Sequence, residues 1–178
     1  MKRNAATFLL LLLVACFSAT VIAGGDNPNP RPIMGLLSGD AYWVPEEYCD
    51  GVNYEPSVGS PLTTVSTFFG EVSHLGSSEF HTIHCSTNTG QYLLRGVGTL
   101  IAANGDELWL EYSAEAISPV VIPGTIVYEI VNVVVGGTGR FEDASGVIQG
   151  LVFVTLTIDN EGNPNAQADM ELAGSFSF

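Results

Sequence analysis

Polar and apolar residues alternate along most of the chain after residue 32, and this period-two pattern constrains the fold more than any other feature of the sequence. In one segment the residues on one face are all apolar or aromatic: Leu108, Leu110, Tyr112, Ala114 and Ala116. Glutamates at positions 107, 111 and 115 lie on the opposite face. Because successive side chains of a β-strand point to opposite faces, this alternation predicts strands with one buried face. We therefore expect an all-β domain.

Turn-forming residues divide this domain into eight predicted strands. The strongest hairpin signal is Asn104-Gly105-Asp106, since Asn-Gly tolerates the positive φ angles of a type I′ turn. Further breaks fall at residues 74–77, 119–124 and 160–164. The predicted strands span residues 33–44, 65–75, 78–86, 91–103, 107–117, 125–135, 146–159 and 166–178. Eight antiparallel strands joined by short turns close readily into an up-and-down barrel, whose interior is filled by side chains or holds one small ligand. A two-sheet β-sandwich is the alternative architecture.

The first 23 residues have the features of a secretory signal peptide. Lys2 and Arg3 precede an apolar run over residues 5–14, and small or permissive residues lead up to Ala23. Polar residues at positions 18 and 20 interrupt the segment, so a membrane span is not expected. The order of elements predicts a signal peptide at 1–23, a Pro- and Gly-rich linker at 24–32 and a single barrel domain at 33–178.

A second interpretation of the N-terminal segment is lipidation. Leu13-Val14-Ala15-Cys16 resembles the lipobox of bacterial lipoproteins, in which the cysteine is acylated. Residues 17–23 are largely apolar, whereas a polar chain usually follows a lipid anchor. Export as a secreted or periplasmic protein is therefore the first expectation, and anchoring at Cys16 is the alternative.

The charge balance excludes one class of partner. Without the first 23 residues, the chain keeps three arginines and no lysine against all 19 acidic residues. Nucleic-acid binding requires cations that face phosphates, so no nucleic-acid partner is expected. An anionic membrane surface is disfavoured for the same reason.

Two cysteines remain after the N-terminal segment, Cys49 and Cys85. An even pair in an oxidising compartment predicts a disulfide, which stabilises the fold by ~3–4 kcal/mol in the chain-entropy model. Such a bridge would also hold the long excursion at residues 45–64 against the third predicted strand. Two separate buried thiols are the alternative.

In the predicted strand 125–135, residues 126–135 carry apolar side chains on both faces, interrupted only by Glu129 and Asn132. One face can line the barrel interior, and the other requires a loop, a partner subunit or lipid. We therefore expect a homo-oligomer, a dimer or a trimer. If Glu129 pointed inward, it would be a buried carboxylate of the kind that clusters at functional sites.

Few residues of the sequence are candidates for catalysis, ligand binding or metal binding. Glu129 is one weak catalytic candidate, and His74 with Glu71 could form an acid–base pair across a turn. Tyr128 and Asn132 are the candidate ligand-binding residues, because a barrel that acts on an apolar substrate needs an interior lined by aromatic side chains and one or two buried polar groups. His81 and His84 are three residues apart and so point to opposite faces, and no metal site is expected.

A glycine-rich string is the most specific motif. It reads Gly136-Gly137-Thr138-Gly139-Arg140-Phe141, followed by Ala144-Ser145-Gly146. A phosphate-binding loop needs a helix after its glycines, whereas a strand is predicted here. We therefore expect a barrel corner in which the glycines at 136, 137, 139 and 146 are structural, Phe141 enters the core and Arg140 pairs with a carboxylate.

This string resembles the glycine-rich segment of the allene oxide cyclase and dirigent superfamily of calycin-like, eight-stranded barrels. A His-Leu-Gly turn at 74–76 and an Ala-Asn-Gly-Asp hairpin at 103–106 extend the resemblance over roughly residues 65–178. Within the superfamily the chain is most similar to small exported bacterial proteins of unassigned function. The resemblance implies an apolar barrel that steers a reactive intermediate or orients radicals, and often a trimer. No catalytic or pocket residue of these proteins matches a position here.

Three functional classes follow. We expect an exported, non-enzymatic barrel that holds a small apolar ligand and needs no cofactor. A cyclase or isomerase acting on an apolar substrate inside the barrel is the main alternative, with Glu129, Tyr128 and Asn132 as the polar groups to look for. An eight-stranded outer-membrane barrel is the third, because the alternation that ends at Phe178 fits the C-terminal pattern of such proteins.

Overall fold

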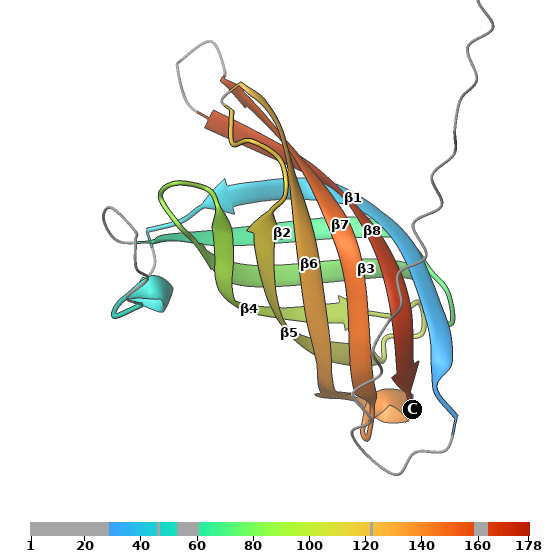
Figure 1. The fold of residues 1–178 in the computed structure, drawn as a ribbon. Coiled ribbons are helices and arrows are strands. Elements are labelled where there is room, and N and C mark those ends of the chain that lie inside the picture. Colours follow the sequence, from blue (N-terminus) through green and yellow to red (C-terminus); the bar gives the residue numbers. More distant parts are fainter. Residues whose placement is uncertain (1–28, 46, 53–60, 122, 159–163) are drawn as a thin grey trace, which may run out of the picture.

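The computed structural model describes residues 29–45, 47–52, 61–121, 123–158 and 164–178, which form one closed barrel of eight antiparallel strands (Figure 1). Each strand pairs with its neighbours in sequence, and the last pairs with the first. The elements are β1 (Arg31–Trp43), η1 (Glu47–Cys49), β2 (Leu62–Val72), β3 (Gly76–Ser86), β4 (Tyr92–Ile101), β5 (Glu107–Ala116), β6 (Gly124–Gly137), η2 (Gly139–Phe141), β7 (Ser145–Ile158) and β8 (Pro164–Ser177). The predicted up-and-down barrel is confirmed, and the two-sheet sandwich is wrong.

Some predictions concern the ends of the domain. The signal peptide at 1–23, Cys16 and residues 160–163 of the predicted turn at 160–164 lie outside the described residues, whereas Pro164 begins β8. The first strand begins at Arg31, so the last two residues of the expected linker pair with β8. Among the described residues, no helix is long and apolar enough to span a membrane.

The alternation places the apolar face of each strand in the barrel interior. In β5, Leu108 and Leu110 are almost fully buried, whereas the glutamates of the same strand, at positions 107, 111 and 115, are partly or fully exposed. The interior side chains of all eight strands form one apolar cluster. Burial of this cluster, at roughly 25 cal/mol per Å² of apolar surface, is the main driving force for closing the barrel.

Two inward glycines of β4 make room for large rings. A Cβ at Gly96 would lie 2.4 Å from Tyr112 Cε2, and a Cβ at Gly98 would lie 2.5 Å from Phe80 Cε2. Side chains at these two positions would overfill the interior. The glycines therefore let the rings of Phe80 and Tyr112 lie across the inner surface of the sheet.

One end of the barrel is closed by aromatic side chains. Phe141, in η2, is fully buried, and its ring centroid lies 5.1 Å from that of Phe178 and 6.0 Å from that of Phe176. Figure 1 shows η2 beside the C-terminus at this end. These side chains fill the interior at this end of the barrel.

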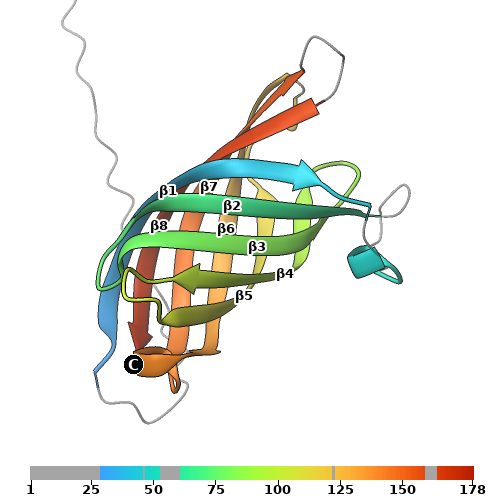
Figure 2. The same cartoon turned by 180° about the vertical axis from the view of Figure 1, so that it is seen from behind.

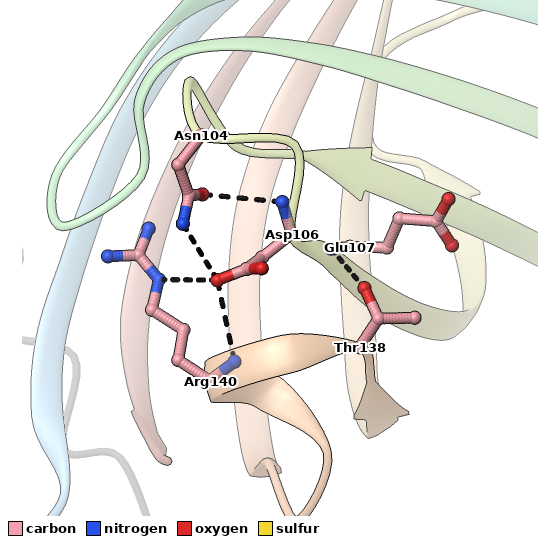
Figure 3. A network of polar contacts seen from close by, with 5 residues as sticks. All are labelled: Asn104, Asp106, Glu107, Thr138 and Arg140. Carbon is pink, nitrogen blue, oxygen red and sulfur yellow. Dashed lines mark hydrogen bonds and ion pairs between the residues drawn. The ribbon is translucent and has the colours of Figure 1, made fainter.

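The motifs that carry the superfamily resemblance meet at the closed end (Figure 3). The Asp106 carboxylate accepts hydrogen bonds from Asn104 Nδ2 at 2.8 Å and from the Arg140 backbone N–H at 3.4 Å, and it lies 3.6 Å from Arg140 Nε. Thr138 Oγ1 accepts a hydrogen bond from the Glu107 backbone N–H at 2.9 Å. The glycine-rich corner is thus fastened to the hairpin that follows β4.

The turn at this hairpin differs from the prediction. Gly105 has a φ of 86°, but Asn104 keeps a negative φ, so the turn is not type I′. The Gly105 N–H bonds to the Ala102 oxygen, and the Ala102 N–H bonds to the Asp106 oxygen. This pattern is a type I turn followed by a glycine bulge, in which only the glycine needs a left-handed conformation. The Ala103 N–H also donates to Leu75 O, which ties the third motif to the same corner.

The opposite end carries a disulfide. Cys49 and Cys85 are bridged, with Cα atoms 5.5 Å apart, as the sequence predicts. The bridge fixes η1 to β3, and Figure 2 shows η1 beside the ends of β2 and β3. Tyr48 adds a hydrogen bond to the backbone oxygen of Arg95. The segment that follows β1 is therefore held against the rim of the open end.

Candidate ligand-binding site

A cavity of about 350 Å³ occupies the open end of the barrel. Its lining includes the terminal residues Trp43 of β1 and Ser86 of β3, but no residue of the aromatic cluster at the closed end. This volume lies within the range of small-molecule sites in proteins. The interior is thus partly filled by side chains and partly open.

One wall of the cavity is apolar. It is formed by the inward side chains of β6, β7 and β8, among them Ile126, Ile130, Val152, Leu156, Ala168 and Met170. In β8 the residues next to the cavity are small, because Ala166 and Ala168 precede Met170 on the inward face. Small side chains on a strand of a closed barrel leave space that bulky ones would fill.

The facing wall is polar but uncharged. It comes from β2 and β3, which contribute Thr64, Ser66, Thr82, His84 and Ser86. The Thr64 and Ser86 hydroxyls hydrogen-bond to each other at 2.8 Å. Among the described residues that line the cavity, none is Asp, Glu, Lys or Arg. A charged ligand would therefore lose its hydration without gaining an ionic partner.

His84 and Tyr112 form a buried polar pair within the cavity. His84 Nδ1 lies 2.7 Å from the Tyr112 hydroxyl, and the two side chains are only 7% and 8% exposed. Desolvation by burial lowers the pKa of His84 to about 4 and raises the pKa of Tyr112 well above its ordinary value. Both groups are consequently neutral at physiological pH.

Tyr128 lies at the mouth of the cavity. Its hydroxyl donates a hydrogen bond to the Gly90 backbone oxygen at 2.6 Å, and burial raises its pKa to about 12. A Cβ at Gly90 would lie 3.0 Å from Val120, and Gly90 has a φ of 69°. The bond from Tyr128 thus anchors the turn between β3 and β4 at the rim, and the ring lines the cavity.

Asn132 lies deeper in the barrel and does not line the cavity. It is 1% exposed, and its Nδ2 donates to the Ile148 backbone oxygen at 3.1 Å. Its Oδ1 has no hydrogen-bond partner among the described residues, an uncommon state for a buried polar atom. In the sheet, Asn132 pairs directly with Tyr112, so it belongs to the floor below the buried polar pair.

The three candidate catalytic residues lie elsewhere. Glu129 is exposed on the outer face of β6, opposite Glu115, so the inward position considered for it is wrong. Glu71 and His74 are exposed near the closed end, and His74 Nε2 bonds to the Pro32 oxygen at 3.0 Å rather than to a carboxylate. None of the three lines the cavity.

The remaining histidines separate as their spacing predicts. His81 points outward and contacts Glu79 at 2.9 Å, whereas His84 points inward. Within the part of the chain that the structure describes, no group of three metal-ligating side chains converges. Sequence reasoning missed the role of His84 because β2 and β3 carry polar residues on both faces, which hides the inward direction.

The fold of this chain is similar to that of solved dirigent protein structures. The barrel matches the structure of the pterocarpan synthase dirigent protein PsPTS1 with a TM-score of 0.50 and 13% sequence identity, covering 86% of this chain and 99% of that chain. A second structure, the pterocarpan synthase dirigent protein GePTS1, gives a TM-score of 0.48 and 17% identity over 84% of this chain and 86% of that one. The chain has a dirigent-like barrel fold.

The likeness extends to the fold alone. No family model matches the sequence, and no curated protein matches it either. At such low identity, residues of the dirigent proteins cannot be assigned to positions in this chain, and a shared fold does not establish a shared function. The features that bear on function are therefore the cavity, its apolar wall and its polar, uncharged wall.

Proposed function

We propose that this protein is an exported, non-enzymatic binding barrel that holds one small, largely apolar molecule in the cavity at its open end. The single observation that carries the proposal is the cavity itself, which has an apolar wall from β6, β7 and β8 and no charged residue among its described lining. Sites of this size and character bind small molecules by burying most of their surface.

Export is part of the proposal. The Cys49–Cys85 disulfide is compatible with an oxidising compartment, and the N-terminal segment has the pattern of a secretory signal. Lipid anchoring at Cys16 is the alternative form of this proposal. Mass spectrometry of the mature N-terminus distinguishes the two, because an acylated cysteine adds the mass of its lipid.

A cyclase or isomerase is the second candidate function. The buried pair of His84 and Tyr112 favours it, because this pair supplies hydrogen-bonding groups beside an apolar wall. The carboxylate candidates favour the binding role instead, since Glu71 and Glu129 are exposed outside the cavity. The outer-membrane alternative is not favoured, because the apolar cluster faces inward, the reverse of a barrel with a polar lumen.

The outer surface supports a homo-oligomer. Val131, Val133 and Val135 on the outer face of β6 are 36%, 45% and 50% exposed, and Val133 pairs with Val147 of β7, which is 36% exposed. Met34 of β1, 70% exposed, adds to the apolar surface of the barrel. We propose that a second copy of the chain covers the valines of β6 in a dimer or trimer.

Native mass spectrometry of the mature protein, purified without detergent from its own cells, tests the binding role. We expect a species heavier than a whole-number multiple of the chain that loses a small apolar molecule on activation. A uniformly empty protein that also fails to take up small apolar molecules would contradict the proposal. Incubation of the released molecule with fresh protein, followed by chromatography and mass spectrometry, separates the two functions, because only an enzyme converts it.

A further inference from the structure

The polar wall of the cavity contains a hydrogen-bond donor that the protein itself does not use. Tyr112 is held by two neighbours, His84 at 2.7 Å and the hydroxyl of Thr82. The Thr82 hydrogen bond opposes the rise in the pKa of Tyr112 that burial causes. When Thr82 donates to the phenol oxygen, the single phenol proton is left for the bond to Nδ1 of His84.

That arrangement corresponds to one tautomer of His84. A neutral imidazole that accepts a hydrogen bond at Nδ1 carries its own proton on Nε2. In the described part of the chain, Nε2 has no acceptor within hydrogen-bond distance, and His84 lines the cavity. Among the described residues, the fully buried side-chain atom without a hydrogen-bond partner is Asn132 Oδ1, not Nε2 of His84. Nε2 is therefore open to the cavity, where the oxygen of a ligand can accept its hydrogen bond.

Resting on the proposed binding function, we infer that the ligand is a neutral, mostly apolar molecule with a carbonyl or ether oxygen that accepts a hydrogen bond from Nε2–H of His84. The apolar wall contacts the hydrocarbon part, and Tyr112 and Thr82 act as positioning residues that keep the imidazole in its donating form. A carboxylate ligand is disfavoured, since the described lining offers no cation to pair with it.

Three probes of nearly equal shape test this inference. They are 2-acetylnaphthalene, which carries a carbonyl oxygen, 2-isopropenylnaphthalene, in which a methylene group replaces that oxygen, and the anion 2-naphthoate. Binding is measured by titration calorimetry with the full mature protein after any co-purified molecule has been extracted. Hydrophobicity alone would favour the alkene, so a preference for the ketone reports a hydrogen bond.

We expect the ketone to bind about fivefold more tightly than the alkene, which corresponds to one net hydrogen bond, and the anion to bind most weakly. The variant His84→Phe should lose the ketone preference and keep alkene binding. His81→Phe is the matched control, because His81 lies on the outer face of the same strand, and it should preserve the preference.

The outcomes separate the inference from the function on which it rests. Equal or tighter binding of the alkene to the wild type, or tightest binding of 2-naphthoate, would overturn the inference and leave the binding role intact. If none of the three probes binds, the proposed function and the inference both fail. Should His84→Phe not fold, Tyr112→Phe removes the donor to Nδ1 and should reduce the ketone preference.

Discussion

The ring of Tyr112 packs directly on the backbone of Gly96, its partner across the β4–β5 ladder. A Cβ at Gly96 would lie 2.4 Å from Cε2 and 2.5 Å from Cζ of the ring. The missing side chain lets the phenol lie across the sheet with its hydroxyl 2.7 Å from His84 Nδ1. Gly96 therefore positions a ring that lines the cavity, although Gly96 itself does not line it.

Gly96→Ala should displace this ring and destabilise the barrel by about 1–3 kcal/mol, the usual cost of overpacking a filled interior. Denaturant unfolding of the variant measures the loss. The effect should shrink in a Tyr112→Ala background, where the clash is absent, and a double-mutant cycle measures this coupling. Gly98→Ala is the matched control, because its Cβ would contact Phe80 instead of Tyr112. This variant should lower the free energy of unfolding by a similar amount but leave the preference for the ketone probe intact. Strict additivity in the cycle would contradict the packing relationship.

The burial of neutral His84 should make stability depend on pH. The pKa of His84 is lowered from 6.5 to about 4 in the folded protein, so the unfolded chain binds a proton between these values and the folded chain does not. The contribution of neutral His84 to the free energy of unfolding is fully present above pH 6.5. It falls as the pH decreases from 6.5 to 4, and it changes no further at lower pH. It amounts to about 3 kcal/mol, at 1.36 kcal/mol per pKa unit.

Unfolding free energies measured from pH 7 to pH 4 test this linkage, with His84→Gln as the comparison. The variant should lose markedly less stability than the wild type over this interval. His81→Gln, which removes an exposed histidine of the same strand, should keep the wild-type slope. Parallel curves for the wild type and His84→Gln would show that His84 is not held neutral by burial.

The barrel could be predicted from the sequence because alternation and turn residues are local signals that agree with each other. Strands such as β5 alternate cleanly, and the observed β5, Glu107–Ala116, ends within one residue of the expected segment. The turn at Asn104-Gly105 was located correctly but assigned the wrong type, because Asn-Gly is compatible with more than one hairpin geometry.

The cavity could not be predicted in the same way. Whether a barrel interior is open depends on how side chains from strands far apart in sequence share it, as Tyr112 and Gly96 show. His84 sits in a strand with polar residues on both faces, so alternation did not reveal its direction. Glu129 is a charged residue in an apolar strand, yet the period of two places it outward, in phase with Val131 and Val133.

Reduction of the Cys49–Cys85 bridge should destabilise the protein by about 4 kcal/mol, because the bridge closes a loop with a sequence separation of 36 residues. Thermal unfolding with and without dithiothreitol measures the change. The double variant Cys49→Ala/Cys85→Ala is the control, and its unfolding should not respond to the reductant. An unchanged wild-type midpoint under verified reduction would contradict this expectation.

Asp106→Ala should loosen the closed end without affecting the cavity. The substitution removes the acceptor of the Asn104 and Arg140 hydrogen bonds, and we expect a loss of about 1–2 kcal/mol because the group is partly exposed. Asp143→Ala removes an exposed carboxylate nearby and should change stability by less than about 0.5 kcal/mol. Probe binding should be retained in both variants, since the cavity lies at the other end. Loss of binding in Asp106→Ala alone would show that the two ends are coupled.

Val133→Glu should convert the proposed oligomer to a monomer. The substitution places a charge among the outward valines of β6, beside Glu111 of β5, which pairs with Val133 in the sheet. If the interface formed, the introduced carboxylate would be buried, and it would lose its hydration without gaining an ionic partner. A few apolar contacts cannot offset the free energy of this dehydration. Light scattering coupled to size exclusion measures the mass. The control His81→Glu puts the same charge on the outer face of β3 and should leave the measured mass unchanged. A wild-type protein that is monomeric at all concentrations would contradict the proposed oligomer and show that the valines of β6 stay exposed to solvent.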